Sequence, residues 1–198
     1  AIQDLKQQYH SSRPRIHLNC VITPWNYEHL SEVVEIATDL GIDGLNFQHL
    51  MFVSEEINRA NQQFFEKTFG YDPKLLDTFP VLSPDAINTS RVSAKLATFK
   101  RTASIPLRFL PNIASQDIPF YYEQLDYQFN NTMCIAPWVR ATITPRGNVT
   151  PCIGYVIGNV LEQRFTKIWN SQRYRTFRAE LQKRGIFPGC VRCCHRRY

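Results

Sequence analysis

The chain reads Cys134-Ile-Ala-Pro-Trp138, then Val149-Thr-Pro-Cys152, and finally Pro188-Gly-Cys190-Val-Arg-Cys193-Cys194. This stretch contains five of the six cysteines of a 198-residue chain. Thiolates are soft ligands that favour zinc or iron–sulfur clusters, and four of them that converge complete a metal site. The spacing therefore predicts a metal centre with two pairs of ligands, which are Cys134 with Cys152 and Cys190 with Cys193.

A β-hairpin is predicted between the first two cysteines. Residues 138–143 are rich in β-branched and aromatic side chains, which favour a strand. Residues 145–148, with the sequence Pro-Arg-Gly-Asn, turn the chain, and Val149 with Thr150 begins the returning strand. We expect this hairpin to bring the thiols of Cys134 and Cys152 together at its open end.

The second pair belongs to a short chelate loop. Gly189 lets the backbone wrap closely around a metal that Cys190 already holds. Both Cys193 and Cys194 are near enough to supply the next ligand, but neighbouring residues of an extended segment project in opposite directions. We choose Cys193, because Cys-x-x-Cys is the commoner chelate spacing, and keep Cys194 as the alternative.

Buried structural cysteines and disulfides are the other interpretations. A free cysteine behaves as a small hydrophobe, yet a random scatter rarely yields a hairpin pair followed by a Cys-x-x-Cys pair. No secretory signal is recognisable, and the adjacent Cys193 and Cys194 suit simple disulfide pairing poorly. Reduced cysteines fit the cytoplasm, and the short, charge-interrupted apolar runs predict no membrane span.

Composition indicates a globular protein whose charge is unevenly placed. Hydrophobic residues make up 43% of the chain and aromatic residues 13%, which is enough for a real core. Residues 163–198 carry ten Lys and Arg against Glu180 alone. This basic segment could offset thiolate charge, recruit an acidic partner or form a solvated helical face. It lacks the aromatic-interleaved motifs of nucleic-acid-binding proteins, so we do not expect a nucleic-acid partner.

The N-terminal part of the sequence alternates strand and helix patterns. Residues 15–23 show the period of two of a strand, and residues 27–40 show apolar residues at helical spacing between Asn26 as N-cap and Gly41 as stop. Further elements are predicted in the order strand 42–50, helix 55–69, helix 85–102, strand 105–110 and helix 117–129. Alternating strands and helices of this kind are typical of an α/β fold with a parallel sheet.

The cysteine-rich stretch resembles the SPASM/twitch domains that are appended to radical S-adenosylmethionine enzymes. Cys134, twelve residues, Gly147, four residues and Cys152 match the opening of those domains. Other matching landmarks are Pro137-Trp138, Gly158-Asn-Val160, Phe165-Thr-Lys-Ile-Trp-Asn-Ser171 and Phe177-Arg178. The resemblance implies an auxiliary [4Fe-4S] cluster, and the missing later cysteines of the longer SPASM pattern favour the single-cluster version.

The N-terminal part resembles the later βα units of the partial barrel of radical S-adenosylmethionine enzymes. The resemblance implies a barrel portion at 1–130, followed by a small module of β-hairpin and helix at 131–198. The family's CxxxCxxC loop, which holds the catalytic cluster, is missing from the sequence. We therefore expect a C-terminal part of a longer enzyme, whose missing N-terminal barrel half carries that cluster and which is not active as this part alone.

Candidate ligand-binding residues follow from the predicted sheet. Ligands bind at the carboxyl ends of parallel strands, which places Asn46, Gln48 and His49 near the mouth of a barrel, where they could contact a cofactor. They are about as well explained as satisfied polar groups under a loop. We expect Cys20 to be a core residue and His195 a tail residue.

Two classes of function remain. As implied by the resemblance, the first is an oxidoreductase or maturase that cleaves S-adenosylmethionine, receives electrons from a donor and modifies a substrate with the help of the auxiliary cluster. A peptide or protein is the first candidate for that substrate. The second is a structural zinc module on an α/β scaffold that acts in protein interactions. Iron and sulfide analysis would separate the two classes.

Overall fold

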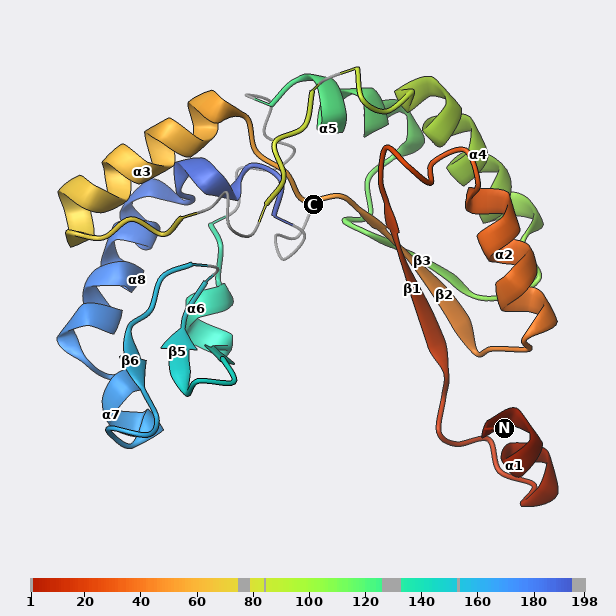
Figure 1. Ribbon diagram of the computed structural model, residues 1–198, viewed down its shortest axis with the longest axis horizontal. Helices are drawn as coiled ribbons and strands as arrows, with labels where there is room; N and C mark the ends of the chain where they lie inside the picture. Colours follow the sequence, from red (N-terminus) through yellow and green to blue (C-terminus); the bar gives the residue numbers. More distant parts are fainter. Residues whose placement is uncertain (1, 75–78, 84, 126–132, 153, 194–198) are drawn as a thin grey trace. The chain divides into compact units, whose positions relative to one another are not determined.

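The computed structural model describes residues 2–74, 79–83, 85–125, 133–152 and 154–193 (Figure 1). The chain forms two compact units, the first from residues up to 50 and from 84 to 124, and the second from residues 51–83 and 125–197. The grouping of residues 51–83 with the cysteine-rich segment was not predicted from the sequence. Among the described residues, no helix combines the length and the apolar character that crossing a membrane would require.

A three-stranded parallel sheet forms the centre of the first unit. Its strands are β1 (His17–Ile22), β2 (Gly44–His49) and β3 (Leu107–Leu110), in the order β1-β2-β3. Cys20 pairs in register with Phe47, which in turn pairs with Phe109. The predicted α/β class, with parallel strands joined through helices, is confirmed.

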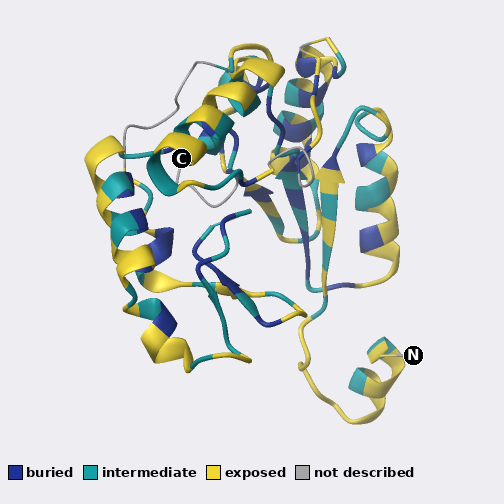
Figure 2. Cartoon of the chain, turned by 60° about the vertical axis from the view of Figure 1, so that its left-hand side comes forward, coloured by how far each residue is buried: buried dark blue, intermediate teal, exposed yellow. Residues whose placement is uncertain are grey.

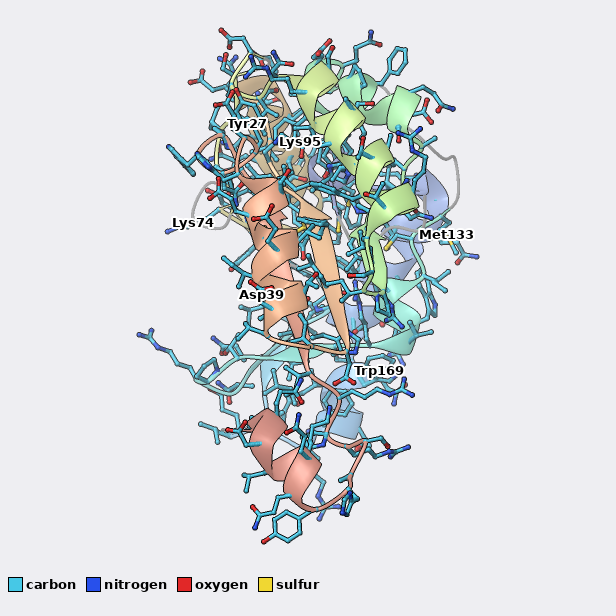
Figure 3. All side chains as sticks on the ribbon, turned by 90° about the vertical axis from the view of Figure 1, so that its right-hand side faces the viewer. Tyr27, Asp39, Lys74, Lys95, Met133 and Trp169 are labelled. Atoms are coloured by element: carbon cyan, nitrogen blue, oxygen red, sulfur yellow. The ribbon has the colours of Figure 1, made fainter. Side chains whose placement is uncertain are left out.

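Helices pack on one face of this sheet (Figure 1). They are α2 (Leu30–Asp39), α4 (Thr89–Thr102) and α5 (Ile118–Glu123), the last preceded by the short turn η2 (Ser115–Asp117). The ring of Phe47 on β2 stacks 5.8 Å from Phe99 of α4 and 6.0 Å from Phe109 of β3. Lys95 of α4, labelled in Figure 3, donates to the carbonyl oxygen of Glu28.

The N-terminal helix α1 (Ile2–Gln8) contains no buried residue, as its colours in Figure 2 show. Two polar contacts connect it to the loop before β2. Gln3 donates to the carbonyl oxygen of Gly41, and the Lys6 ammonium lies 2.9 Å from the Asp43 carboxylate. The same carboxylate also accepts the backbone N–H of Ile16. The Lys6 contact is the largest cause that lowers the pKa of Asp43, and the hydrogen bond from Ile16 adds to it.

Two helix starts differ from the prediction, and in both places an asparagine side chain is hydrogen-bonded to the backbone. Asn26 was expected to cap a helix from residue 27, but its side chain accepts the backbone N–H of Thr23 and α2 begins only at Leu30. The next helix was expected from residue 85 and begins at Thr89, because Asn88 accepts the N–H of Arg91 as its N-cap. The predicted stop at Gly41 is confirmed, since this residue adopts a φ of +58° after α2.

The second unit contains the predicted hairpin, in a shorter form. Strand β4 (Thr142–Ile143) pairs antiparallel with β5 (Asn148–Thr150), and β6 (Gly158–Asn159) adds a third strand beside β5. Trp138 and Val139 were expected in the first strand, but they belong to the helical turn α6 (Ala136–Val139). Pro137 in its first turn has the fixed backbone angle that favours helix.

Helices surround this small sheet. They are α3 (Glu55–Phe69), α7 (Phe165–Trp169) and α8 (Gln172–Arg184), followed by the turn η3 (Pro188–Cys190). Phe65 of α3 lies 5.6 Å from Tyr155, 5.2 Å from Phe187 and 6.5 Å from Phe177 of α8, measured between ring centres. The aromatic core therefore joins a helix from early in the chain to the cysteine-rich segment.

Replacing Phe65 by Ala should destabilise the second unit by about 3–5 kcal/mol, because it leaves a cavity among three aromatic rings. Trp138 and Trp169 belong to this unit, whereas Trp25 of the first unit is 84% exposed, so tryptophan fluorescence during urea unfolding reports mainly on the second unit. Gln63→Ala, on the exposed side of α3, is the control and should change little. Equal stabilities of the two variants would contradict the packing of α3 on this core.

His49 is held neutral inside the first unit. It is 1% exposed, its Nδ1 lies 3.0 Å from the Tyr122 hydroxyl, and its ring contacts that of Tyr121. Burial lowers the pKa of His49 to about 3, and the charge of Lys100 adds to this effect. Below its ordinary pKa of 6.5, the unfolded chain therefore takes up a proton that the folded chain refuses.

The stability of the first unit should consequently fall as the pH is lowered from about 6.5 towards 3, by up to about 1.4 kcal/mol per pH unit. His49→Phe should flatten this dependence in urea unfolding curves recorded from pH 7 to pH 4.5, even if it lowers stability overall. His29→Gln, at a side chain that is 61% exposed, is the control and should keep the slope. An unchanged slope in His49→Phe would show that another group titrates.

Candidate metal centre

Four of the described cysteines line one cavity of about 390 Å³ in the second unit. They are Cys134, Cys152, Cys190 and Cys193, the four predicted ligands. Cys194, the alternative ligand, lies outside the described residues. The structure thus brings together all members of the predicted set that it describes, although they come from sequence positions up to 59 apart.

The hairpin places the first two cysteines. Cys134 comes just before α6, and its backbone N–H donates to the carbonyl oxygen of Gly185 at 3.1 Å. Cys152 follows β5, which is fixed by the register of Thr150 opposite Thr142. Within the turn, Gly147 has a φ of +79° and donates its N–H to the carbonyl oxygen of Thr144. Glycine adopts this backbone conformation easily, and the chain can therefore reverse direction between the two cysteines.

The chelate loop is anchored by a residue that the sequence did not reveal. Cys190 ends η3 and donates its N–H to Phe187, and Cys193 donates its N–H to the carbonyl oxygen of Cys190 at 3.3 Å. The N–H of Gly189 donates to the side chain of Asn61 on α3, which is 2% exposed. Nothing in the sequence around Asn61 resembles a metal motif, so only the fold could show that α3 supports this loop.

The thiols influence one another electrostatically. Burial raises the pKa of the Cys190 thiol well above its ordinary value, and the neighbouring Cys152, Cys193 and Cys134 add to the rise. Because binding of a metal requires thiolates, an uncharged Cys190 in the apoprotein means that loading releases a proton there.

The cavity wall has an apolar and a polar part. Phe177, Leu181 and Phe187 supply apolar surface, and the hairpin contributes the polar residues Arg140, Thr142, Thr144 and Thr150. Within the described ranges, no three or more His, Cys, Asp or Glu side chains are gathered closely enough to hold a single metal ion. The four thiols instead line the cavity described above.

Arginines of the basic segment pack on aromatic rings. The guanidinium of Arg178 lies 4.4 Å from the ring centre of Trp169 and 4.0 Å from that of Tyr174. Arg173 lies 5.1 Å from the Tyr155 ring, and Arg184 lies 4.3 Å from the Phe64 ring. Part of the positive charge in this region is therefore engaged in cation–π contacts with aromatic rings.

The candidate residues on β2 do not share one face of the sheet. Asn46 and Gln48 lie on the face that also carries Asn19 and Arg108, and Asn46 donates to the side chain of Asn19 at 2.7 Å. His49 lies on the helix-covered face with Phe47. Cys20 lies in register with Phe47 and burial raises its pKa, but it is only half-buried and is not one of the fully buried core residues that were expected to include it.

Comparison with known proteins identifies the cysteine module. Residues 134–194 match the SPASM family, which is described as an iron-sulfur cluster-binding domain, and this confirms the resemblance. Over 70 residues, the chain is 34% identical to an S-adenosyl-L-methionine-dependent 2-deoxy-scyllo-inosamine dehydrogenase of Niallia circulans. That match covers 32% of this chain and 28% of the dehydrogenase. No solved structure matches the chain significantly.

Proposed function

We propose that residues 134–194, as a SPASM domain, hold an auxiliary [4Fe-4S] cluster on the thiolates of Cys134, Cys152, Cys190 and Cys193. The observation that carries this proposal is the single cavity that all four thiols line. Its volume of about 390 Å³ is in the range of small-molecule sites, so it has room for a cluster of several atoms. Four thiolates are also the donor set that such clusters require.

When bound, a cluster of this type supplies one-electron redox chemistry. The protein supplies the environment that adjusts it. Apolar side chains such as Phe177 and Phe187 line the cavity and would shield a cluster from water, and the cavity also has polar lining residues such as Arg140 and Thr142. Burial and hydrogen bonding of the sulfurs are the properties that set the potential of a cluster.

The first unit fits a portion of a radical S-adenosylmethionine barrel. Purely parallel sheets normally have both faces covered, yet one face of this sheet carries the exposed polar residues Asn19 and Arg108. On the same face, the Oδ1 atom of Asn46 is buried and has no hydrogen-bond partner among the described residues. A missing donor at this atom supports the proposal that Asn46 and Gln48 face a ligand in the barrel interior.

The whole enzyme would then be an S-adenosylmethionine-dependent oxidoreductase or maturase. The barrel half with the catalytic cluster and an electron donor are its proposed partners, and the cytoplasm, which keeps thiols reduced, is its proposed location. A peptide or protein is our first candidate substrate. The name of the Niallia circulans relative suggests a second one, a small amino alcohol of the 2-deoxy-scyllo-inosamine type.

Metal analysis tests the cluster directly. The chain prepared without oxygen should be brown and should contain about four irons and four sulfides per molecule. Cys134→Ser, Cys152→Ser and Cys190→Ser should each lose most of this iron and lower the thermal stability of the second unit, because metal affinity contributes to folding in small sites. Cys20→Ser, in the first unit, is the control and should keep its iron.

Two outcomes would contradict the proposal. One zinc per chain without sulfide would support the structural zinc module instead. Full iron and sulfide in all three ligand variants would show that the cluster is held elsewhere.

The fourth ligand can be determined with two further variants. Cys193 lines the cavity, so Cys193→Ser should lose or destabilise the cluster, whereas Cys194→Ser should leave iron and sulfide unchanged. The same analysis of iron and sulfide, together with the absorption band of the cluster, measures both. The reverse pattern would move the ligand to Cys194, and equal losses would indicate that both cysteines are needed.

A further inference from the structure

The segment that carries the first cysteine, residues 134–140, is attached to α8 at three points along its length. The N–H of Cys134 donates to the carbonyl oxygen of Gly185 at 3.1 Å. The Nε of Arg178 donates to the carbonyl oxygen of Pro137 at 2.9 Å, and the hydroxyl of Tyr174 donates to that of Arg140 at 3.4 Å. The segment therefore lies along the helix, with Arg178 at its centre.

Arg178 also reaches a third element. Its Nη1 donates to the carbonyl oxygen of Trp169, the last residue of α7, at 3.0 Å. Its guanidinium packs against the rings of both Trp169 and Tyr174, whose centres lie 4.9 Å apart. Two carbonyl oxygens in different directions and two aromatic rings need a rigid, planar group with several donors, which arginine has and lysine lacks.

The wall of the cavity lies directly beside this contact. Ala136 and Pro137 line the cavity, and so does Phe177, which precedes Arg178 on α8. Arg178 thus fixes this part of the wall through Pro137, which lies three residues after Cys134 in the sequence. The other thiols have supports of their own, because Cys152 follows β5 and Cys190 belongs to the loop that Asn61 anchors.

We propose that Arg178 is a positioning residue for the metal centre: it fixes the segment that carries Cys134 and thereby sets where this one thiolate binds the cluster. This inference rests on the proposed function, since it assumes that the four thiols hold a cluster. Loss of the Arg178 contacts should leave three ligands in place and let the fourth move. One iron should then become labile, and the spectrum of the reduced cluster should change.

Three variants test this role against charge and against general stability. Arg178→Gln removes both the guanidinium and its charge, whereas Arg178→Lys keeps the charge but lacks the planar group that donates to both carbonyl oxygens. Arg175→Gln removes the same charge from an exposed position of α8 and serves as the control. Tyr174→Phe removes only the hydroxyl that holds Arg140, and it keeps the ring for stacking.

The full chain is reconstituted with iron and sulfide, and loss of iron to a chelator is followed together with the electron paramagnetic resonance spectrum of the reduced protein. Both Arg178 variants should lose iron about tenfold faster or more, the factor that corresponds to one lost hydrogen bond from a charged donor. Both should also show shifted resonance positions. Tyr174→Phe should have a smaller effect in the same direction, and Arg175→Gln should match the wild type.

The outcomes separate this inference from the proposed function. A wild-type chain that takes up no iron and sulfide would overturn the proposed function and this inference with it. A loaded wild type with unchanged iron loss and spectra in both Arg178 variants would overturn this inference alone. Full rescue by Arg178→Lys would also overturn it, because charge and not the two carbonyl contacts would then be responsible. If Arg178→Gln fails to fold, Arg178→Lys decides, because it alters the two carbonyl contacts and keeps the charge: iron loss and a spectrum identical to the wild type would overturn the role.

Discussion

The cost of gathering four thiols around one cavity constrains the rest of the second unit. Burial disfavours the thiolate form, and the mutual repulsion of neighbouring thiolates raises the pKa of Cys190 further. Without a metal, the Cys190 thiol is therefore uncharged, and the scaffold must hold the cysteines in place with no metal–sulfur bonds to help it. An aromatic core and hydrogen bonds from elements far apart in sequence provide this rigidity, and the basic residues of α8 contribute positive charge nearby.

The sequence predicted the helices and strands better than the tertiary contacts between them. The parallel β-α-β order, the hairpin turn and the helix at 55–69 all appear, because each depends on local periodicity or turn chemistry. The role of α3 in the cysteine module was not predictable, since Phe65 and Asn61 acquire their partners only through tertiary contacts. Asn88 caps α4, and Asn26 accepts a hydrogen bond from Thr23 in the turn before α2; hydrophobic periodicity encodes neither contact.

The candidate site residues also differ in how well the sequence predicted their placement. Spacing alone predicted that Cys134, Cys152, Cys190 and Cys193 come together at one cavity, because a hairpin and a Cys-x-x-Cys loop have few ways to present their thiols. For Asn46, Gln48 and His49, the expectation of a common site at the strand ends ignored the alternation of side chains across a sheet. The period of two puts His49 into the core with Tyr122, while Asn46 and Gln48 lie on the opposite face.

The path of the chain between the two units has a consequence for synthesis. The chain enters the second unit at residue 51, returns to the first at 84 and re-enters the second at 125. Helix α3 is therefore translated about a hundred residues before Tyr155, Phe177 and Phe187 exist to cover its aromatic face. Contacts over such a sequence separation form late, and until then Phe64, Phe65 and Phe69 present a surface that a nascent chain must shield from aggregation.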